Sequence, residues 1–208
     1  MTAIQLPSSP GPNKVSVHML DWGNELVPTL GGPTVRLDRM GNRHSADFTL
    51  PPMNAAQAMA WCQRLKRGKS ARVRMPFTQP GFTPFVSPVI YASASLTGGS
   101  SLPVQNVFAP NTFKEGQFLS VYRGSLDQYF LYSIDADVAI ANTGGGVGSG
   151  TLSITPPLRT PVGAAGAGGD TIFVNSMVIE GYLSGNSVDW TIDVAQFYGL
   201  AFTVTEAA

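Results

Sequence analysis

Few side chains in this sequence combine the type and the spacing that catalysis needs. His18 and His44 both fall inside segments that alternate apolar and polar residues, and no Gly-x-Ser-x-Gly elbow occurs. A hydrolytic triad needs one histidine as the base, so we interpret both as structural or surface residues. Cys62 lies on the apolar side of a predicted helix, where a thiol is more often buried than reactive. Two histidines and one cysteine also argue against a zinc site.

Glycine-rich segments raise the question of phosphate binding. Gly68-Lys69-Ser70 is similar to the end of a P-loop, but Gln63 stands where that motif requires its first glycine. A helix is also predicted before this tripeptide instead of after it. Neither Gly144–Gly150 nor Gly163–Gly169 has the spacing of a dinucleotide-binding turn, so we predict that both are flexible turns. We therefore expect no nucleotide and no other cofactor.

Paired carboxylates are the remaining catalytic option. Asp189 and Asp193 share one face of a predicted strand, where four residues at ~3.3 Å each separate them by ~13 Å. Inverting glycosidases place their carboxylates ~6.5–9.5 Å apart, so this pair does not fit. Asp135 and Asp137 also share a face and could help to bind a divalent cation, although no further oxygen ligands lie nearby in sequence. We expect neither a catalytic pair nor a metal site.

One concentration of positive charge spans the end of the predicted helix and the strand after it. Cations stabilise a helix C-terminus, so this cluster is explained by favourable helix-end charges and a solvated strand edge. Docking against an acidic neighbouring subunit is the functional alternative. Nucleic-acid binding is disfavoured because no aromatic residues are interleaved for base stacking. The possible subunit-interface residues are Arg64, Lys66, Arg67, Lys69, Arg72 and Arg74.

Composition points to a protein with permanent partners. Charged residues make up 12% of the 208 residues, about half of the ~25% usual in soluble domains, whereas hydrophobic residues make up 43%. Lys plus Arg equals Asp plus Glu at 13 each, so no net field attracts nucleic acid or an anionic membrane. The single cysteine fits a reducing cytoplasm. No apolar stretch reaches membrane-spanning length and the N-terminus has no signal-peptide pattern, so we expect no membrane insertion.

The elements follow from periodicity. Apolar–polar alternation in short runs between Gly and Pro residues predicts a mainly β protein. Helical spacing of apolar residues predicts one helix over Asn54–Arg67, with Asn54 and Gln57 forming a capping box and Gly68 as a left-handed terminator. The predicted strands lie around residues 15–20, 35–38, 44–50, 71–76, 118–122, 129–134, 151–155, 171–174, 177–183, 188–194 and 200–205. In the strand at 188–194 we expect Trp190, Ile192 and Val194 to face a core.

The predicted domain organisation is discontinuous. Residues 78–110 are rich in Pro, Gly and Ser, which indicates that the chain passes there from one unit to another, with a boundary near Ile90. Because chain ends often meet in one domain, the first and last thirds are expected to share a sheet. We predict a β-sandwich with one helix from residues 1–90 and 175–208, and a small β-barrel from residues 91–174 inserted into it.

Several segments resemble distal tail proteins of long-tailed phages and gene transfer agents. The similarity is carried by Leu30-Gly31-Gly32-Pro33-Thr34-Val35-Arg36-Leu37-Asp38-Arg39, by Gly41-Asn42-Arg43, by Phe48-Thr49-Leu50-Pro51-Pro52-Met53, by Ala58, Trp61 and Arg67-Gly68-Lys69, and by Glu115-Gly116-Gln117-Phe118, Thr151–Arg159 and Gly199–Val204. These loose patterns cover most of the chain. Gly98–Pro110 and Gly144–Gly150 depart from the pattern, because they look longer and looser.

The resemblance implies a structural virion protein and not an enzyme. It would form a homo-oligomeric ring of six copies at the distal end of the tail, joining the tail tube protein to hub or baseplate proteins, after assembly in the host cytoplasm. No residue role is transferred, since the resemblance carries no catalytic residue. A carbohydrate- or receptor-binding module is the alternative, in which Trp22, Trp190 or the strand Tyr129–Tyr132 would stack on sugar rings.

Overall fold

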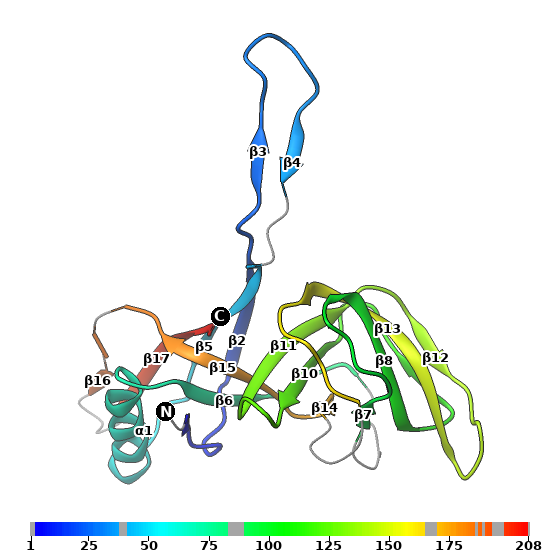
Figure 1. Cartoon of the computed structure of the whole chain (residues 1–208). Helices are drawn as coiled ribbons and strands as arrows, with labels where there is room; N and C mark the ends of the chain where they lie inside the picture. Colours follow the sequence, from blue (N-terminus) through cyan, green and yellow to red (C-terminus); the bar gives the residue numbers. More distant parts are fainter. Residues whose placement is uncertain are drawn as a thin grey trace.

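The fold consists of an open β-sheet with one helix, a closed β-barrel and a projecting hairpin (Figure 1). The computed structural model describes residues 3–37, 41–82, 90–164, 170–185, 187–188, 190–192 and 198–207. This arrangement confirms the predicted mainly β class with one helix and a small barrel, and it is consistent with a sandwich-plus-barrel fold. The barrel strands run from Ile90 to Phe173, so they lie in sequence between sheet strands β6 and β15.

The open sheet has seven strands, in the order β1-β6-β15-β17-β5-β2, and β16 pairs with β17 beside this path. Strand β2 therefore forms one edge of the sheet. The ladders are antiparallel, apart from the short parallel pairing of β1 with β6. The strands are β1 (Ile4–Gln5), β2 (Lys14–Leu20), β5 (Arg43–Thr49), β6 (Val73–Phe77), β15 (Met177–Leu183), β16 (Trp190–Ile192) and β17 (Tyr198–Glu206).

Helix α1 (Ala55–Gly68) covers part of one sheet face, as the apolar spacing predicts. Ala58, Trp61 and Leu65 are buried on the side that packs on the sheet, where Trp61 contacts Phe202. The capping box of Asn54 with Gln57 is confirmed. The prediction for Gly68 is wrong: it is the last helical residue, it is buried, and a Cβ there would lie 2.4 Å from Val73 Cγ1. Close packing, not a left-handed turn, accounts for this glycine.

The barrel closes in the order β10-β11-β13-β8-β7-β14 around an apolar core. A two-stranded ribbon, β9 with β12, accompanies it. The barrel core contains Val104, Phe113 and Ile154, whereas Leu131 of β11 belongs to the core of the sheet. The strands are β7 (Ile90–Ala92), β8 (Gly99–Phe108), β9 (Asn111–Phe113), β10 (Phe118–Arg123), β11 (Gln128–Ile134), β12 (Val138–Ile140), β13 (Val147–Leu158) and β14 (Thr171–Phe173).

Two segments expected to be long and loose contain ordered strands. Gly98–Pro110 contains β8, whose Leu102, Val104 and Val107 are buried in the barrel core. Within Gly144–Gly150, only the first three residues form a turn, and β13 begins at Val147. Glycine is needed at Gly148 because a Cβ there would lie 2.1 Å from the carbonyl oxygen of Ala141. Gly148 therefore permits close packing, whereas Gly144, Gly145 and Gly146 adopt the positive φ angles of a turn.

The described part of the strand predicted over 188–194 does not face a core. In β16, Trp190 and Ile192 are both exposed, so the prediction that they face a core is wrong. The reason is position: β16 pairs only with the first residues of β17, at the margin of the sheet. Asp189, Asp193 and Val194 lie outside the described residues, as does most of Gly163–Gly169.

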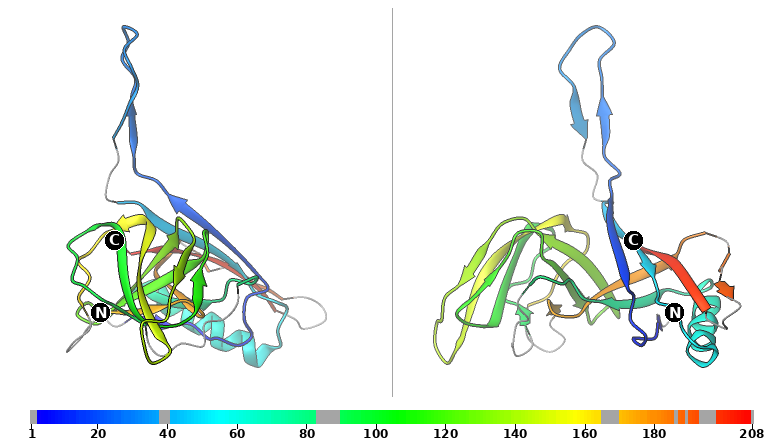
Figure 2. Two further views of the ribbon diagram at one scale, coloured as in Figure 1. Left: turned by 90° about the vertical axis from the view of Figure 1, so that its right-hand side faces the viewer. Right: turned by 180° about the vertical axis from the view of Figure 1, so that it is seen from behind.

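A hairpin of β3 (Asn24–Leu26) and β4 (Val35–Leu37) projects away from the rest of the molecule, as both views of Figure 2 show. It interrupts the connection between sheet strands β2 and β5. All six strand residues are exposed. The sequence predicted a strand at 35–38 but not this projection.

The substitution Gly148→Ala tests the packing role of this residue. We expect it to lower the free energy of unfolding by about 1–3 kcal/mol, because the new Cβ overlaps backbone atoms of Ala141. Gly163→Ala is the control, since its nearest non-neighbouring atom would be 3.8 Å away. Equal urea-unfolding midpoints for the two variants would show that Gly148 is not sterically constrained.

Candidate functional site

The predicted cationic cluster is divided between two sides of the molecule. On the helix side, Arg64 donates to the carbonyl of Gln5, Lys69 donates to the carbonyls of Ser184 and Gly185, and Lys66 lies over the ring of Trp190. Arg67 is exposed on the last helical turn. Arg72 and Arg74, by contrast, extend from the segment at β6 toward the barrel. A subunit interface built from all six residues stays a prediction.

Arg72 and Arg74 belong to a buried polar junction between sheet and barrel. The sheet side contributes the carboxylates of Glu180 and Glu206 together with Arg72, Arg74 and His44. The barrel side contributes Arg159 and the edge of β11. Both glutamates are almost inaccessible to solvent, at 0% and 1% exposure. Buried carboxylates need full compensation, so their partners determine how the two units are joined.

The junction is built on two backbone N–H groups that no strand pairs. Strand β11 pairs along its length with β10, but it pairs with β13 only at Ser133 and Ile134. The N–H groups of Tyr129 and Leu131 lie two residues apart and so point to the same unpaired edge. Glu180 accepts the first at 3.1 Å and Glu206 accepts the second at 2.7 Å. The two carboxylates occupy the place of a neighbouring strand.

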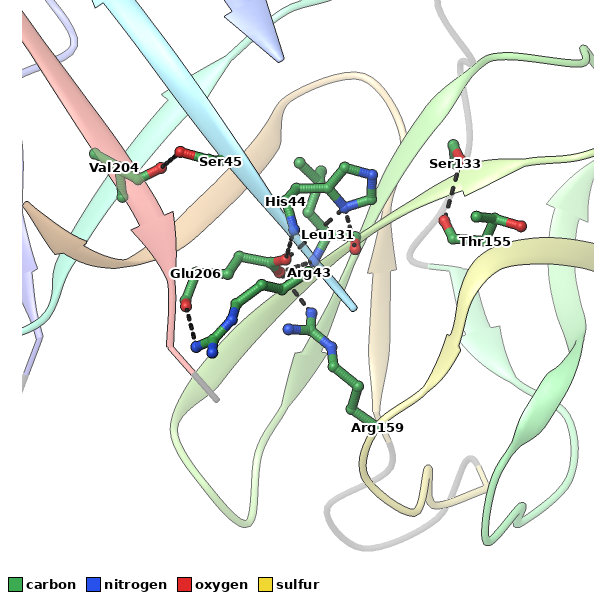
Figure 3. Close-up of polar contacts among 9 residues, drawn as sticks. All are labelled: Arg43, His44, Ser45, Leu131, Ser133, Thr155, Arg159, Val204 and Glu206. Atoms are coloured by element: carbon green, nitrogen blue, oxygen red, sulfur yellow. Dashed lines mark hydrogen bonds and ion pairs between the residues drawn. The ribbon is translucent and has the colours of Figure 1, made fainter. Parts of the chain in front are cut away.

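Glu206 has the more complete set of partners (Figure 3). Its Oε1 accepts hydrogen bonds from the Leu131 N–H and from Arg159 Nη2 at 2.8 Å, and its Oε2 accepts one from the His44 N–H at 2.7 Å. Arg43 donates to the backbone carbonyl of Glu206 at 3.4 Å. The carboxylate thus joins β5, β11 and the end of β13 to the last residue of β17.

Glu180 forms the second half of the junction. Its Oε2 accepts from Arg74 Nε at 2.7 Å and its Oε1 lies 3.2 Å from Arg72 Nη1. Arg74 also donates to the carboxylate and the carbonyl of Asp127, in the turn between β10 and β11. Asp127 has a positive φ of 48°, which aspartate tolerates in turns. The arginine pair therefore holds this barrel turn against β6 and β15.

His44 is a buried histidine beside Glu206. Desolvation lowers its pKa below the ordinary value, although the nearby Glu206 carboxylate acts in the opposite direction. Its Nδ1 lies 3.1 Å from the carbonyl oxygen of Leu131, so the neutral ring donates from Nδ1. The ring edge also packs against Phe118. His44 is structural, in agreement with the sequence interpretation.

Arg159 is enclosed by aromatic rings of the barrel. Its guanidinium lies 5.3 Å from the ring centroid of Phe130 and 5.9 Å from that of Tyr132. Burial raises the pKa of Tyr132 to about 12, so its hydroxyl stays protonated and adds no negative charge. The positive charge of Arg159 is therefore left to neutralise Glu206, which makes this ion pair well suited to a low-dielectric interior.

The other candidates from the sequence lie at the surface. His18 Nε2 is 3.0 Å from Asp47 Oδ2, and Thr203 donates to Asp47 Oδ1, all on an exposed sheet face. The hydrogen bond from Thr203 is the main cause that lowers the pKa of Asp47. Asp137 binds Lys114, while Asp135 accepts from Ser153. Within the described ranges, no three His, Cys, Asp or Glu side chains form a group that could hold a metal ion.

Sequence reasoning missed Glu180, Glu206 and Arg159. A signal was present, because the chain has only four glutamates and these two stand in the apolar segments Val178–Gly181 and Val204–Ala207. A charge within a buried strand pattern indicates a paired, buried ion. Its partner could not be identified, since Arg159 is 47 positions from Glu206.

Replacing Glu206 by Gln should destabilise the fold by about 3–5 kcal/mol, because the Arg159 charge would remain buried without its partner. Because glutamine has the same shape and volume as glutamate, the loss of stability would come from the lost charge and hydrogen bonds. Asp137→Asn, which breaks a half-exposed pair with Lys114, is the control and should have little effect. Urea unfolding of both variants measures the difference, and equal losses would contradict the junction's role.

Protonation of His44 should make stability fall in mild acid. Its folded pKa is lowered, so below about pH 6.5 the unfolded chain takes up this proton first. The contribution of neutral His44 to the free energy of unfolding is therefore complete above pH 6.5. It declines as the pH falls below this value, by at most about 1.4 kcal/mol per pH unit. In His44→Asn, where the amide can still donate to Leu131, unfolding free energies at pH 7.5 and 5.5 should differ less than in the wild type. An unchanged difference would exclude His44 as the source.

The sequence was compared with protein-family models and with curated proteins. No protein-family model matches the chain. A search of curated proteins likewise finds no match. Among the described helical residues, none form a helix that is both long and apolar enough to cross a membrane.

Proposed function

We propose that this chain is a structural subunit of a viral tail, a distal tail adaptor whose ring of six copies joins the tail tube to the hub or baseplate. The proposal starts from the sequence resemblance. The segments that carry it include residues 30–37 in the projecting hairpin, 48–53 at the end of β5 and before α1, and 199–204 in β17. An enzymatic role is not part of the proposal.

The observation that most supports an adaptor is the junction. An adaptor must present two different surfaces in a fixed relation, and here the sheet and the barrel are joined by two buried carboxylates with their arginines. If the barrel moved relative to the sheet, these ion pairs would separate and leave buried charges without partners. The two units should therefore move as one body, which suits a part that transmits force along a tail.

The surface also suits an assembled protein. Only 12% of the residues are charged, and several of these charges are used inside the junction. Strand β2 is an edge strand that presents unpaired backbone groups along seven residues. Edges and apolar surfaces of this kind are normally covered by a partner.

One observation favours the alternative of a carbohydrate- or receptor-binding module. Trp22 is 53% exposed at the base of the hairpin, and an exposed indole can stack on a sugar ring. However, Arg43 lies 5.4 Å from the centroid of this ring, so one face already has a cationic partner. The adaptor therefore remains the preferred proposal.

Negative-stain electron microscopy and mass photometry of the purified full chain test the adaptor directly. We expect closed rings of six copies that bind to the ends of purified tail tubes from the same virus. A chain that stays off the tubes at every concentration and binds a defined glycan on an array would overturn this proposal in favour of the alternative.

A further inference from the structure

The projecting hairpin, here called the arm (residues 24–37), exposes large apolar side chains along its length. Leu30 at its apex is 99% exposed and Val27 is 69% exposed. Leu26, Val35 and Leu37 are also exposed. A two-stranded ribbon with nothing packed on it is marginally stable in water, so this pattern indicates that a partner covers the arm.

The base of the arm is fixed, which gives the arm a defined direction. Arg36 forms an ion pair with Asp21, and the Trp22 N–H donates to Asn42 Oδ1 at 2.8 Å. Arg43, at the start of β5, lies over the Trp22 ring. The arm therefore extends from the end of β2 without folding back on the body (Figures 1 and 2).

A groove lies at the other end of β2. Its volume is about 610 Å³, and Val15, Val17, Phe77 and Phe118 line it together with polar residues that include Asn13 and Gln79. A volume of this size, within the ~300–1,000 Å³ of typical ligand sites, has room for several apolar side chains. Lys14 is the ionisable side chain among its described lining residues.

The arm cannot fill the groove of its own chain. The groove is lined by Lys14, Val15 and Val17 toward the start of β2, whereas the arm continues from the other end of that strand and points away from its start. One chain thus carries two apolar surfaces, a convex arm and a concave groove, that can meet only between copies.

We propose that the arm of one copy inserts into this groove of a second copy. The contact is heterologous, so it forms a ring where the rotation between copies closes and a filament where it does not. Both surfaces are mainly apolar, and Glu25 of the arm has the sign needed to meet Lys14 at the groove. The inference rests on the proposed adaptor function and names the contact between its copies.

Analytical ultracentrifugation of the full chain tests the arm. We expect reversible self-association of the wild type, and in Val27→Ser/Leu30→Ser a dissociation constant at least about 10-fold higher, as loss of two buried apolar side chains implies. Both residues are exposed, so circular dichroism should show an unchanged fold. Leu126→Ser, at an exposed leucine in the β10–β11 turn, is the matched control and should associate like the wild type.

Charge reversal tests the groove without altering packing. Glu25→Lys and Lys14→Glu should each weaken association up to about 5-fold, and the double variant should recover it, because every copy then carries the reversed pair. A double variant weaker than either single variant would overturn the pairing of arm with groove.

A mixing experiment tests the head-to-tail geometry. Thr78→Arg, which introduces a large side chain at an exposed groove position, should not self-associate, yet its arm is intact. Mixed with the arm variant, it should give dimers and nothing larger. Wild-type monomers at all concentrations, or arm variants that associate normally, would overturn the inference. Co-sedimentation with tail tubes is measured in parallel. If the chain binds tubes but its self-association does not depend on the arm, only the arm–groove contact is refuted. If self-association depends on the arm but the chain does not bind tubes, only the adaptor function is refuted.

Discussion

Two buried carboxylates at the edge of one barrel strand determine how this molecule is put together. The Tyr129 and Leu131 N–H groups of β11 have no strand partner, and a buried unpaired N–H costs about 1–3 kcal/mol. Glu180 and Glu206 supply acceptors in place of a strand, but a buried carboxylate is itself costly unless it is neutralised. The arginines complete the arrangement. Removal of any one component leaves another buried polar group unsatisfied, so the junction forms as a unit.

This interdependence explains how a chain with few charges uses them. Arg74 connects Glu180 to the turn at Asp127, and Arg159 connects Glu206 to the aromatic side chains of the barrel. The charges of these arginines and glutamates, which would ordinarily be at the surface, are buried between sheet and barrel, where they fix the orientation of the barrel relative to the sheet. Exposed charges such as Arg67, Asp47 and Asp137 remain, but they are few for a chain of this length. With a formal net charge of zero, copies of this chain would repel one another little, as the proposed assembly requires.

Local periodicity allowed much of the fold to be predicted from the sequence. The capping box of α1 and the strands around Phe48, Leu131 and Ile179 follow from side-chain spacing alone. The sequence did not reveal features that depend on tertiary packing: Gly148 looked flexible because its close approach to the backbone of Ala141, just after β12, exists only in the folded chain. The basic cluster was recognised by type, yet burial by the barrel separated Arg72 and Arg74 from the helix cations. Glu180 and Glu206 were missed because a carboxylate's partners lie far away in sequence.

The arm is the place where local rules are broken most clearly. Leu30 at the apex could be a serine or lysine at no cost to the fold, since it packs against nothing in its own chain. Apolar residues at an exposed hairpin tip promote aggregation unless they are covered, so their presence requires a compensating role. The junction and the arm are then complementary. In the assembly that we propose, a rigid body with a fixed arm would give each copy one orientation relative to the next, whereas a hinged body would lose that order at every contact. That assembly would therefore depend on the same buried carboxylates that join sheet to barrel.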